Sequence, residues 1–450
     1  MTEPELRAAV AGLMPRAREE LAELVAIRSV ADPRQFAPEE CERAAKWVAE
    51  RFADLGFDDV HLAETSDGSE AVVGSRPCAD PSAPTVLLYA HYDVQPPLDD
   101  GAWRTPPFEL TEVEGRWFGR GAADCKGNIV MHLAALRALG EIPVNLKLVV
   151  EGSEEQGTGG LEDFVATHAE LLRADAILVC DTGNAAVGHP ALTVSLRGMV
   201  NVVVTVDSLA SELHSGMFGG AAPDALAALI SMLATLRDAR GNTTIDGLAD
   251  DGTWTGEPYP GERFRADAGV LDGVVLLGDG SVADMLWARP AVTVLGLDAP
   301  PVVGSAAAIV PSAAARLNLR IPPGTTVEQA RTALTEHLEA AAPWGVRVRV
   351  AVEATGAPFQ ATDDGPAYRA MMAAMEEAYG VPSTKLGQGG SIPLCNVFAD
   401  TYPEAEIILI GVEEPQALIH APNESVHPDE IAQMALSEAL FLQRYAAREG

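Results

Sequence analysis

Four short apolar runs in this chain each lead into a segment rich in histidine or carboxylate side chains. A helical segment, 128–139, separates the first run from the second. Near-continuous apolar runs bounded by polar or turn residues are typical of strands buried in a parallel sheet. The pattern therefore predicts an α/β fold with a mostly parallel sheet flanked by helices. The four runs comprise residues 85–89, 146–150, 176–179 and 407–410.

The residues that follow these runs are of the types that bind divalent metal ions. His91 follows the first run, and the doublet Glu154-Glu155 follows the second. Asp181 follows the third run, and His420 comes after the fourth run and a loop. In an open α/β sheet, ligands bind beyond the carboxyl ends of the strands. Position and residue type together predict a metal site there, because imidazole and carboxylate are suitable donors for such ions.

A second unit is predicted between the third and fourth runs, since 450 residues exceed what one hydrophobic core usually serves. The order of strands and helices within residues 191–355 is that of the ferredoxin-like split β-α-β motif. We therefore expect an inserted α+β domain at 191–355 and a discontinuous catalytic domain at 1–190 and 356–450. Residues 241–289 show little periodicity and are expected to form a surface loop with a short helix. The strands and helices expected in the insertion are 192–206, 223–240, 291–297, 313–321, 326–341 and 346–353.

The charge of the chain argues against several classes of partner. There are 31 basic and 65 acidic side chains, which give a net charge of −34. Such a surface repels phosphate backbones and anionic lipids, so neither a nucleic acid nor a membrane partner is expected. The same charge argues against a two-metal nuclease or phosphatase. Five scattered cysteines without a C-x-x-C spacing, and an acidic N-terminus without an apolar leader, favour a cytoplasmic location.

The ligand types fit a pair of metal ions better than a single ion. Two ions about 3.5–4 Å apart can activate a water molecule between them and polarise a carbonyl group. Such a site needs one bridging carboxylate, for which we select Asp124. We expect His91 and Asp181 on one ion, and Glu155 and His420 on the other.

Two further acids complete the expected site. Asp93 is suited to accept the second N–H of the His91 imidazole and so to orient it. Glu154 is expected to remain off the metal and to act as the general base, then acid, in hydrolysis. Asp124 is also positioned to cap the following helix, and His427 competes with His420 as a ligand, although it precedes a proline at the start of a helix.

Four segments of the chain resemble one known family. It is the dinuclear zinc peptidase family of carnosinases, cytosolic non-specific dipeptidases, aminoacylases, acetylornithine deacetylase and succinyl-diaminopimelate desuccinylase. The resemblance spans about residues 15 to 445, and the wording His-Tyr-Asp-Val-Gln-Pro is similar to the dipeptidase branch. It implies the site roles given above and two divalent ions, most often Zn²⁺, with Mn²⁺ or Co²⁺ possible. The four segments are residues 91–96, 119–127, 151–155 and 420–424.

The resemblance also implies functional residues in the insertion and near the last strand. Residues 191–355 resemble a lid and dimerisation domain, in which His214 reaches the active site of the other subunit of a homodimer. There it stabilises the oxyanion and contacts the substrate. Arg320 resembles a lid arginine that binds the substrate carboxylate, and Ser391 lies in a glycine-rich substrate loop that contacts the same group.

The expected function is a metal-dependent dipeptidase that hydrolyses short peptides with a free C-terminal carboxylate. The alternative is an N-acyl amino acid deacylase of the same family. A binding protein that has lost catalysis is disfavoured by the complete ligand set and by Glu154. Cys125, Gln388 and Ala308 depart from the residues typical of the family, which leaves side-chain preference open.

Overall fold

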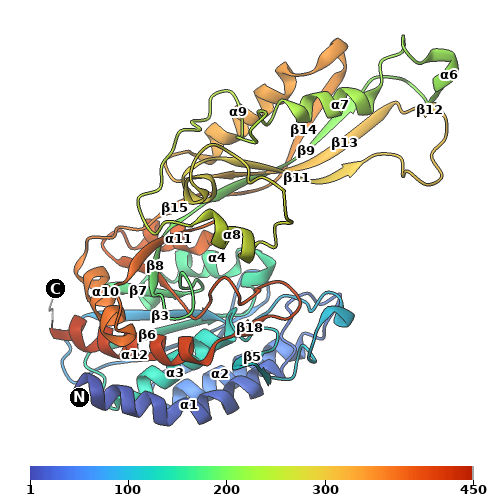
Figure 1. Cartoon of the computed structure of the whole chain (residues 1–450). Coiled ribbons are helices and arrows are strands. Elements are labelled where there is room, and N and C mark those ends of the chain that lie inside the picture. The colour runs from blue at the N-terminus through green and yellow to red at the C-terminus, as the bar shows by residue number, and fades with distance from the viewer. Residues whose placement is uncertain (448–450) are drawn as a thin grey trace. The chain divides into compact units, whose positions relative to one another are not determined.

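The structure is a computed structural model that describes residues 1–447, apart from the side chain of residue 100. It contains two compact units (Figure 1). Unit 1 comprises Met1–Val194, Ala361–Leu386 and Leu394–Gly450, and unit 2 comprises Ser195–Gln360 and Gly387–Pro393. The sequence groups residues 387–393 with the catalytic segment, whereas the structure groups them with unit 2. The physical reason is local pairing, because the Arg197 backbone N–H donates to the Gln388 carbonyl oxygen at 3.1 Å.

The central strands of unit 1 form a mixed sheet in the order β1-β2-β6-β3-β7-β17-β8. The four strands expected from the apolar runs are β3, β6, β7 and β17, and they are neighbours that pair in parallel. The prediction of a mostly parallel core flanked by helices is thus confirmed. The strands are β1 (Asp58–Glu64), β2 (Glu70–Arg76), β3 (Thr85–His91), β6 (Asn145–Glu151), β7 (Ala176–Cys180), β8 (Ala191–Leu196) and β17 (Glu406–Ile410).

Helices cover both faces of this sheet, with α1, α3 and α12 below the strands in Figure 1 and α4 and α11 above them. On the upper face, the rings of Phe398 and Tyr89 meet edge to face at 6.4 Å. No helix in the described part of the chain is both long and apolar enough to cross a membrane. The helices are α1 (Glu3–Val25), α2 (Glu39–Asp54), α3 (Lys126–Leu139), α4 (Gly160–Thr167), α5 (Ala169–Leu172), α10 (Pro366–Tyr379), α11 (Pro393–Thr401) and α12 (Pro428–Ala447).

A small three-stranded sheet brings two distant loops of unit 1 together. It consists of β4 (Thr111–Val113), β5 (Arg116–Phe118) and β18 (Ser425–Val426), in the order β18-β5-β4. β18 and β5 are antiparallel, with Ser425 opposite Phe118. The loop that ends at residue 424 therefore lies beside the loop that begins at residue 119.

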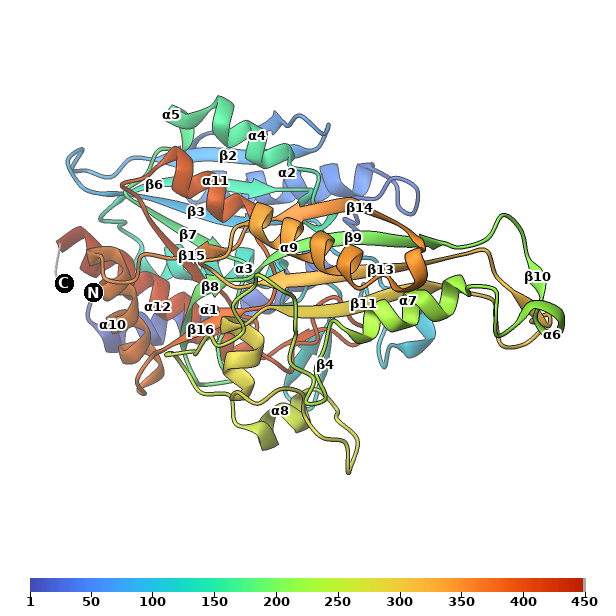
Figure 2. The same ribbon diagram turned by 90° about the horizontal axis from the view of Figure 1, so that it is seen from above.

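Unit 2 is built on an antiparallel sheet with the strand order β11-β13-β9-β14, visible in Figure 2. This is the order of the ferredoxin-like split motif. The strand expected at 192–206 is interrupted at Arg197 and forms β8 and β9. The backbone is close-packed directly after the interruption, since a Cβ added at Gly198 would lie 2.5 Å from the Gly356 carbonyl oxygen. The elements are β9 (Gly198–Asp207), β11 (Ala291–Asp298), β13 (Ser312–Ile321), β14 (Arg347–Gly356), α7 (Ala225–Ala234) and α9 (Val327–Ala340).

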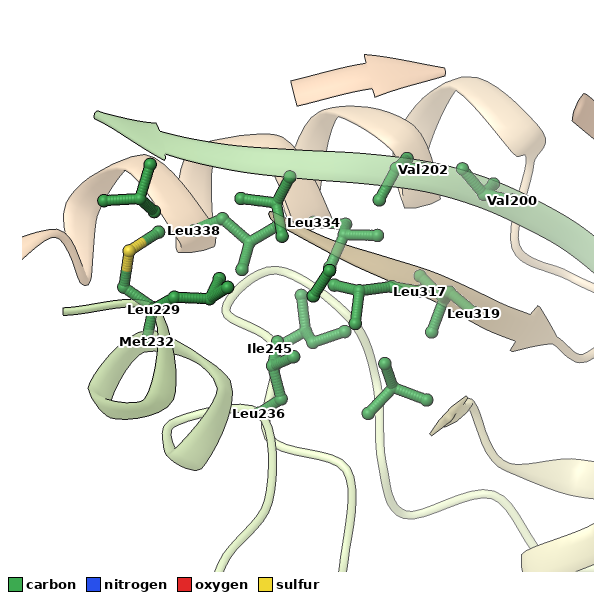
Figure 3. Packing of buried hydrophobic residues seen from close by; sticks show 14 of the residues in the cluster. Val200, Val202, Leu229, Met232, Leu236, Ile245, Leu317, Leu319, Leu334 and Leu338 are labelled. Carbon is green, nitrogen blue, oxygen red and sulfur yellow. The ribbon is translucent and has the colours of Figure 1, made fainter. Parts of the chain in front are cut away.

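One face of this sheet packs against α7 and α9. Alternate residues of β9 are buried, as a half-buried strand requires. Figure 3 shows Val200 and Val202 beside residues of β13 and of both helices, including Leu229 and Leu334. The shorter elements of the region include β10 (Leu213–His214), α6 (Ser215–Phe218), α8 (Gly261–Asp267), the π-helical turn Asp284–Ala288, β12 (Ala308–Ile309), β15 (Phe359–Gln360) and β16 (Thr384–Gln388).

Candidate functional site

The carboxyl ends of two neighbouring strands carry the first pair of expected ligands. His91 is the last residue of β3, and Asp181 directly follows β7, which pairs with β3 in parallel. The His91 Nε2 atom lies 3.2 Å from Asp181 Oδ1 and 3.0 Å from Asp124 Oδ1. The parallel register therefore brings together residues that are 90 positions apart in the chain.

Asp124 lies at the centre of the expected ligands. Its second oxygen, Oδ2, is 2.9 Å from Nε2 of His420. His420 Nε2 is in turn 3.3 Å from Glu155 Oε2. The two oxygens of one carboxylate thus contact two different imidazoles, which suits a carboxylate shared by two metal ions.

Asp93 organises the cluster from behind. One of its carboxylate oxygens accepts the backbone N–H of Glu154 at 3.2 Å, and the other accepts that of Glu155 at 3.1 Å. Nδ1 of His91 is hydrogen-bonded to the backbone carbonyl oxygen of Asp93 at 3.1 Å, and Oδ1 of Asp93 lies 3.4 Å from the same nitrogen. The Asp93 side chain is fully buried, so it makes these contacts without competition from solvent. Asp93 therefore fixes both the imidazole of His91 and the short 3₁₀ helix Glu154–Gln156.

The acid doublet has two different environments. Glu155 is held by Gln95, whose backbone N–H and side-chain Nε2 donate to its two oxygens at 3.2 and 2.6 Å. Burial, together with the Asp124 carboxylate, raises the pKa of Glu155 to about 8. Glu154 is partly buried, and burial followed by the charge of Asp181 raises its pKa well above the ordinary value. A carboxyl with a raised pKa is suited to proton transfer near neutral pH.

The charge balance of the cluster fits bound cations. The hydrogen bond to Asp124 raises the pKa of His420 to about 9. Burial opposes ionisation of Asp124, yet its hydrogen bonds to His420 and His91 lower its pKa overall. The donor atoms of Asp124, Glu155 and His420 all lie within 4.8 Å of one another. Several carboxylates crowded around two imidazoles are stabilised in their ionised form by divalent cations.

A buried ion pair holds the loop that carries Asp124. Glu424 is fully buried and accepts the N–H groups of Gly121, Ala123 and Asp124 at 3.0–3.1 Å. Its carboxylate also accepts from Arg120 Nη1 at 2.7 Å. The sequence includes Glu424 in a motif but gives it no role, and its position at the end of that motif is the signal that points to it.

The segment after Asp124 keeps an unusual backbone despite the cysteine. The Asp124-Cys125 peptide bond is cis. Cys125 is buried, and its thiol donates to the carbonyl oxygen of Cys180 at 2.9 Å. Cys125 therefore joins the Asp124 loop to the end of β7, next to Asp181.

In unit 2, a buried arginine that sequence reasoning missed lies close to two of the expected substrate residues. Arg197 is 8% exposed, and its Nε and Nη1 atoms have no hydrogen-bond partner. A Cβ added at Gly389 would lie 3.0 Å from Arg197 Nη2. Burial, and then the charge of Arg320, lowers the pKa of Arg197 to about 10. The signal in the sequence is a lone arginine between two apolar strand segments.

Ser391 belongs to the same part of unit 2. Its Oγ atom is buried without a hydrogen-bond partner, and a Cβ added at Gly356 would lie 2.8 Å from it. Gly356 and Arg320 both lie opposite Met199 in the sheet. Arg320 and Ser391 therefore flank the start of β9, directly after Arg197. The buried Arg197 guanidinium and Ser391 Oγ, both without partners, suit an anionic ligand.

His214 lies elsewhere in unit 2, in the short strand β10. Its imidazole is exposed, and Nδ1 accepts the Gly216 N–H at 3.1 Å. Ala308, one of the departures from the family, is its register partner on β12. An exposed imidazole on a short two-stranded ribbon leaves the expected role of His214 as a prediction.

Comparisons with known proteins show what this chain is similar to. A model of peptidase family M20/M25/M40 matches residues 87–444. The chain is 45% identical over 412 residues to a cysteinylglycine-S-conjugate dipeptidase of Corynebacterium striatum, with 90% of each protein covered. It is 29% identical to the Cys-Gly metallodipeptidase dug1 of Schizosaccharomyces pombe, over 78% of this chain and 77% of that protein. The crystal structure of human carnosine dipeptidase 1 superposes with a TM-score of 0.82 at 25% identity, and 99% of both chains is covered.

Proposed function

Because the chain belongs to peptidase family M20/M25/M40 and is a metal-dependent dipeptidase, we propose that it hydrolyses dipeptides with a free C-terminal carboxylate. The relative from Corynebacterium striatum is named for cysteinylglycine S-conjugates, so we include S-substituted Cys-Gly among the substrates. These dipeptidase relatives favour peptide-bond hydrolysis over N-acyl deacylation. The observation that carries the proposal is the Asp124 carboxylate between the imidazoles of His91 and His420.

We propose that the cluster of unit 1 holds two divalent metal ions. His91, Asp124 and Asp181 would hold one ion, and Asp124, Glu155 and His420 the other. Zn²⁺ is the first candidate because imidazole and carboxylate suit it, and Mn²⁺ and Co²⁺ suit the same donors. When bound, such ions lower the pKa of a water molecule and polarise the carbonyl of the scissile bond.

The protein groups around the cluster account for proton transfer. Glu154 takes a proton from the attacking water and transfers it to the leaving amine, for which its raised pKa is suited. Asp93 contacts both the Glu154 backbone and the His91 imidazole, so it fixes the position of the general base relative to the expected metal ligand His91. Both roles are proposals that rest on these contacts.

We assign recognition of the substrate carboxylate to unit 2. Arg320 and Ser391 are the expected contacts, and Arg197 adds two buried nitrogens, Nε and Nη1, without acceptors. A guanidinium group that lacks an acceptor is suited to a carboxylate, which it can bind through two parallel hydrogen bonds. We propose that unit 2 serves as the lid.

We further propose a homodimer formed through unit 2, in which His214 acts in the active site of the other subunit. The edge strand β11 supports this, since its Val294, Leu295 and Leu297 side chains are about half exposed. An apolar edge strand is a natural surface for association. We also propose a cytoplasmic location, which suits the five free thiols.

A substrate panel with metal analysis tests the proposed function. The protein would be stripped with a chelator, reloaded with Zn²⁺, Mn²⁺ or Co²⁺, and assayed on dipeptides and on acetyl- and succinyl-amino acids. We expect two metal equivalents per chain and metal-dependent turnover of dipeptides. Faster turnover of the N-acyl amino acids would overturn the dipeptidase proposal, and full activity in the stripped protein would overturn the metal site.

A further inference from the structure

The segment after β17 carries two adjacent buried acids that the proposed mechanism does not use. Glu414 is satisfied, because Arg116 Nη2 donates to it at 2.5 Å and the Gln416 N–H at 2.8 Å. Glu413 is different. It is 5% exposed, and its Oε1 atom has no hydrogen-bond partner. A buried carboxylate oxygen without a donor is costly, so its counterpart must come from elsewhere.

The backbone fixes Glu413 next to the expected ligand Asp181. β17 pairs with β7 in parallel, and Ile410 lies opposite Cys180. The pairing resumes beyond the strands as a parallel bridge between Gly183 and Glu413. The crossing is tight, since a Cβ added at Gly183 would lie 2.1 Å from the Glu413 carbonyl oxygen. Asp181 and Glu413 thus emerge from neighbouring strands at one edge of the sheet.

The side chain of Glu413 is directed toward the metal cluster. One carboxylate oxygen from each of Asp124, Asp181 and Glu413 lies within 4.8 Å of the other two. Three buried carboxylates at this separation repel one another, and a divalent cation reverses the sign of that interaction. Carboxylate oxygens are the ligands that hard divalent cations prefer.

We propose that Glu413 is a further metal ligand, on the ion held by His91, Asp124 and Asp181. This inference rests on the proposed two-metal site and makes its two halves chemically different. The ion near Glu413 would have three carboxylates and one imidazole, whereas the other would have two carboxylates and one imidazole. Oxygen-rich sites suit Mn²⁺, so we expect the first site to take Mn²⁺ more readily than the second.

The test is metal binding by Glu413→Gln, in full-length protein stripped with a chelator and titrated with Mn²⁺ and with Zn²⁺ against a chromophoric chelator. Loss of a partner in or near a metal site typically weakens binding about 10- to 100-fold. We expect a loss of this size for one of the two equivalents, larger for Mn²⁺ than for Zn²⁺, with the other equivalent unchanged. Glu414→Gln is the matched control and should retain both affinities.

The stability of the metal-free protein gives a second readout that separates a ligand from a structural acid. If Glu413 is a ligand, Glu413→Gln should leave the melting temperature of the stripped protein unchanged or higher, because no protein donor contacts its Oε1 atom there. A structural acid would produce a lower melting temperature and unchanged metal affinity.

The outcomes are distinguishable. Unchanged affinity for both equivalents in folded Glu413→Gln would overturn the role of Glu413. If Glu413→Gln does not fold, Glu413→Asp replaces it, because its carboxylate is one methylene shorter. Glu413→Asp should lose affinity for one metal equivalent. Wild-type affinity for both equivalents in Glu413→Asp would also overturn the role of Glu413. Fewer than two equivalents in the wild-type protein would instead overturn the two-metal site.

Discussion

The two units bury polar groups of opposite charge. In each unit some of these buried polar atoms have no hydrogen-bond partner in the protein. In unit 1, carboxylates crowd around His91 and His420, and Glu413 Oε1 has no donor. In unit 2, Arg197 is buried with two nitrogens that have no acceptor. The first unit therefore offers groups suited to cations, and the second offers a group suited to an anion. The comparison indicates how a peptidase can separate metal binding from recognition of the substrate carboxylate.

Burial acts on both units through the same physics with opposite results. It raises the pKa of Glu155 to about 8 and lowers the pKa of Arg197 to about 10, because each group is less stable as an ion away from water. Nearby like charges, Asp124 in the first case and Arg320 in the second, add to the shift. A ligand of opposite charge reverses the effect in both places.

The largest expected effect comes from unit 1. Glu154→Gln should lower kcat for dipeptides about 10²–10⁴-fold, because the amide cannot accept the proton of the attacking water. Metal content, measured by elemental analysis, should stay at the wild-type level. The matched control is Glu162→Gln in α4, which should keep full activity. Wild-type kcat in Glu154→Gln would remove this residue from the mechanism.

A smaller effect is expected from a substitution of His214 in unit 2. This substitution tests whether His214 acts in the active site of the other subunit. His214→Ala should lower kcat about 10²–10³-fold, the usual loss for one oxyanion donor. Mixing His214→Ala with Glu154→Gln subunits should restore activity, because one site in each mixed dimer then contains both intact residues. A mixture as inactive as its components would contradict action across the dimer.

The smallest effect is expected for the anion site. Arg197→Met should raise KM about 10- to 100-fold for dipeptides, since a hydrogen bond to a charged group contributes about 1.5–3 kcal/mol. The comparison substrate is the same dipeptide with a C-terminal amide, for which KM should change little. Arg349→Met, at an exposed arginine of the same sheet, is the control. An equal rise in KM for acid and amide would show that Arg197 only supports the fold.

The parts of the site that follow strands could be predicted from the sequence. The run before His91 is apolar after Thr85, and the run before Asp181 is apolar throughout. Such runs form buried parallel strands because no solvent-exposed face interrupts them. Once the strands are recognised, the side chains at their carboxyl ends must share one edge of the sheet. The strand order of unit 2 could be anticipated in the same way from its succession of helices and strands.

Other features depend on contacts that no local pattern contains. The strand expected at 192–206 breaks at Arg197, next to Gly198, where an added Cβ would lie 2.5 Å from the Gly356 carbonyl oxygen. Glu413 and Glu414 are adjacent and chemically identical, yet Arg116 reaches only one of them. Glu424 acquires its role from backbone N–H groups about 300 positions earlier in the chain.

The sequence alone thus determined which segments form the buried strands and which ligand types follow them, since hydrophobic periodicity is a local property of the chain. Only the tertiary structure decided which buried polar atoms find partners and which do not. That distinction depends on distances between residues far apart in sequence. A polar atom without a partner costs little free energy in water but a large amount when it is buried.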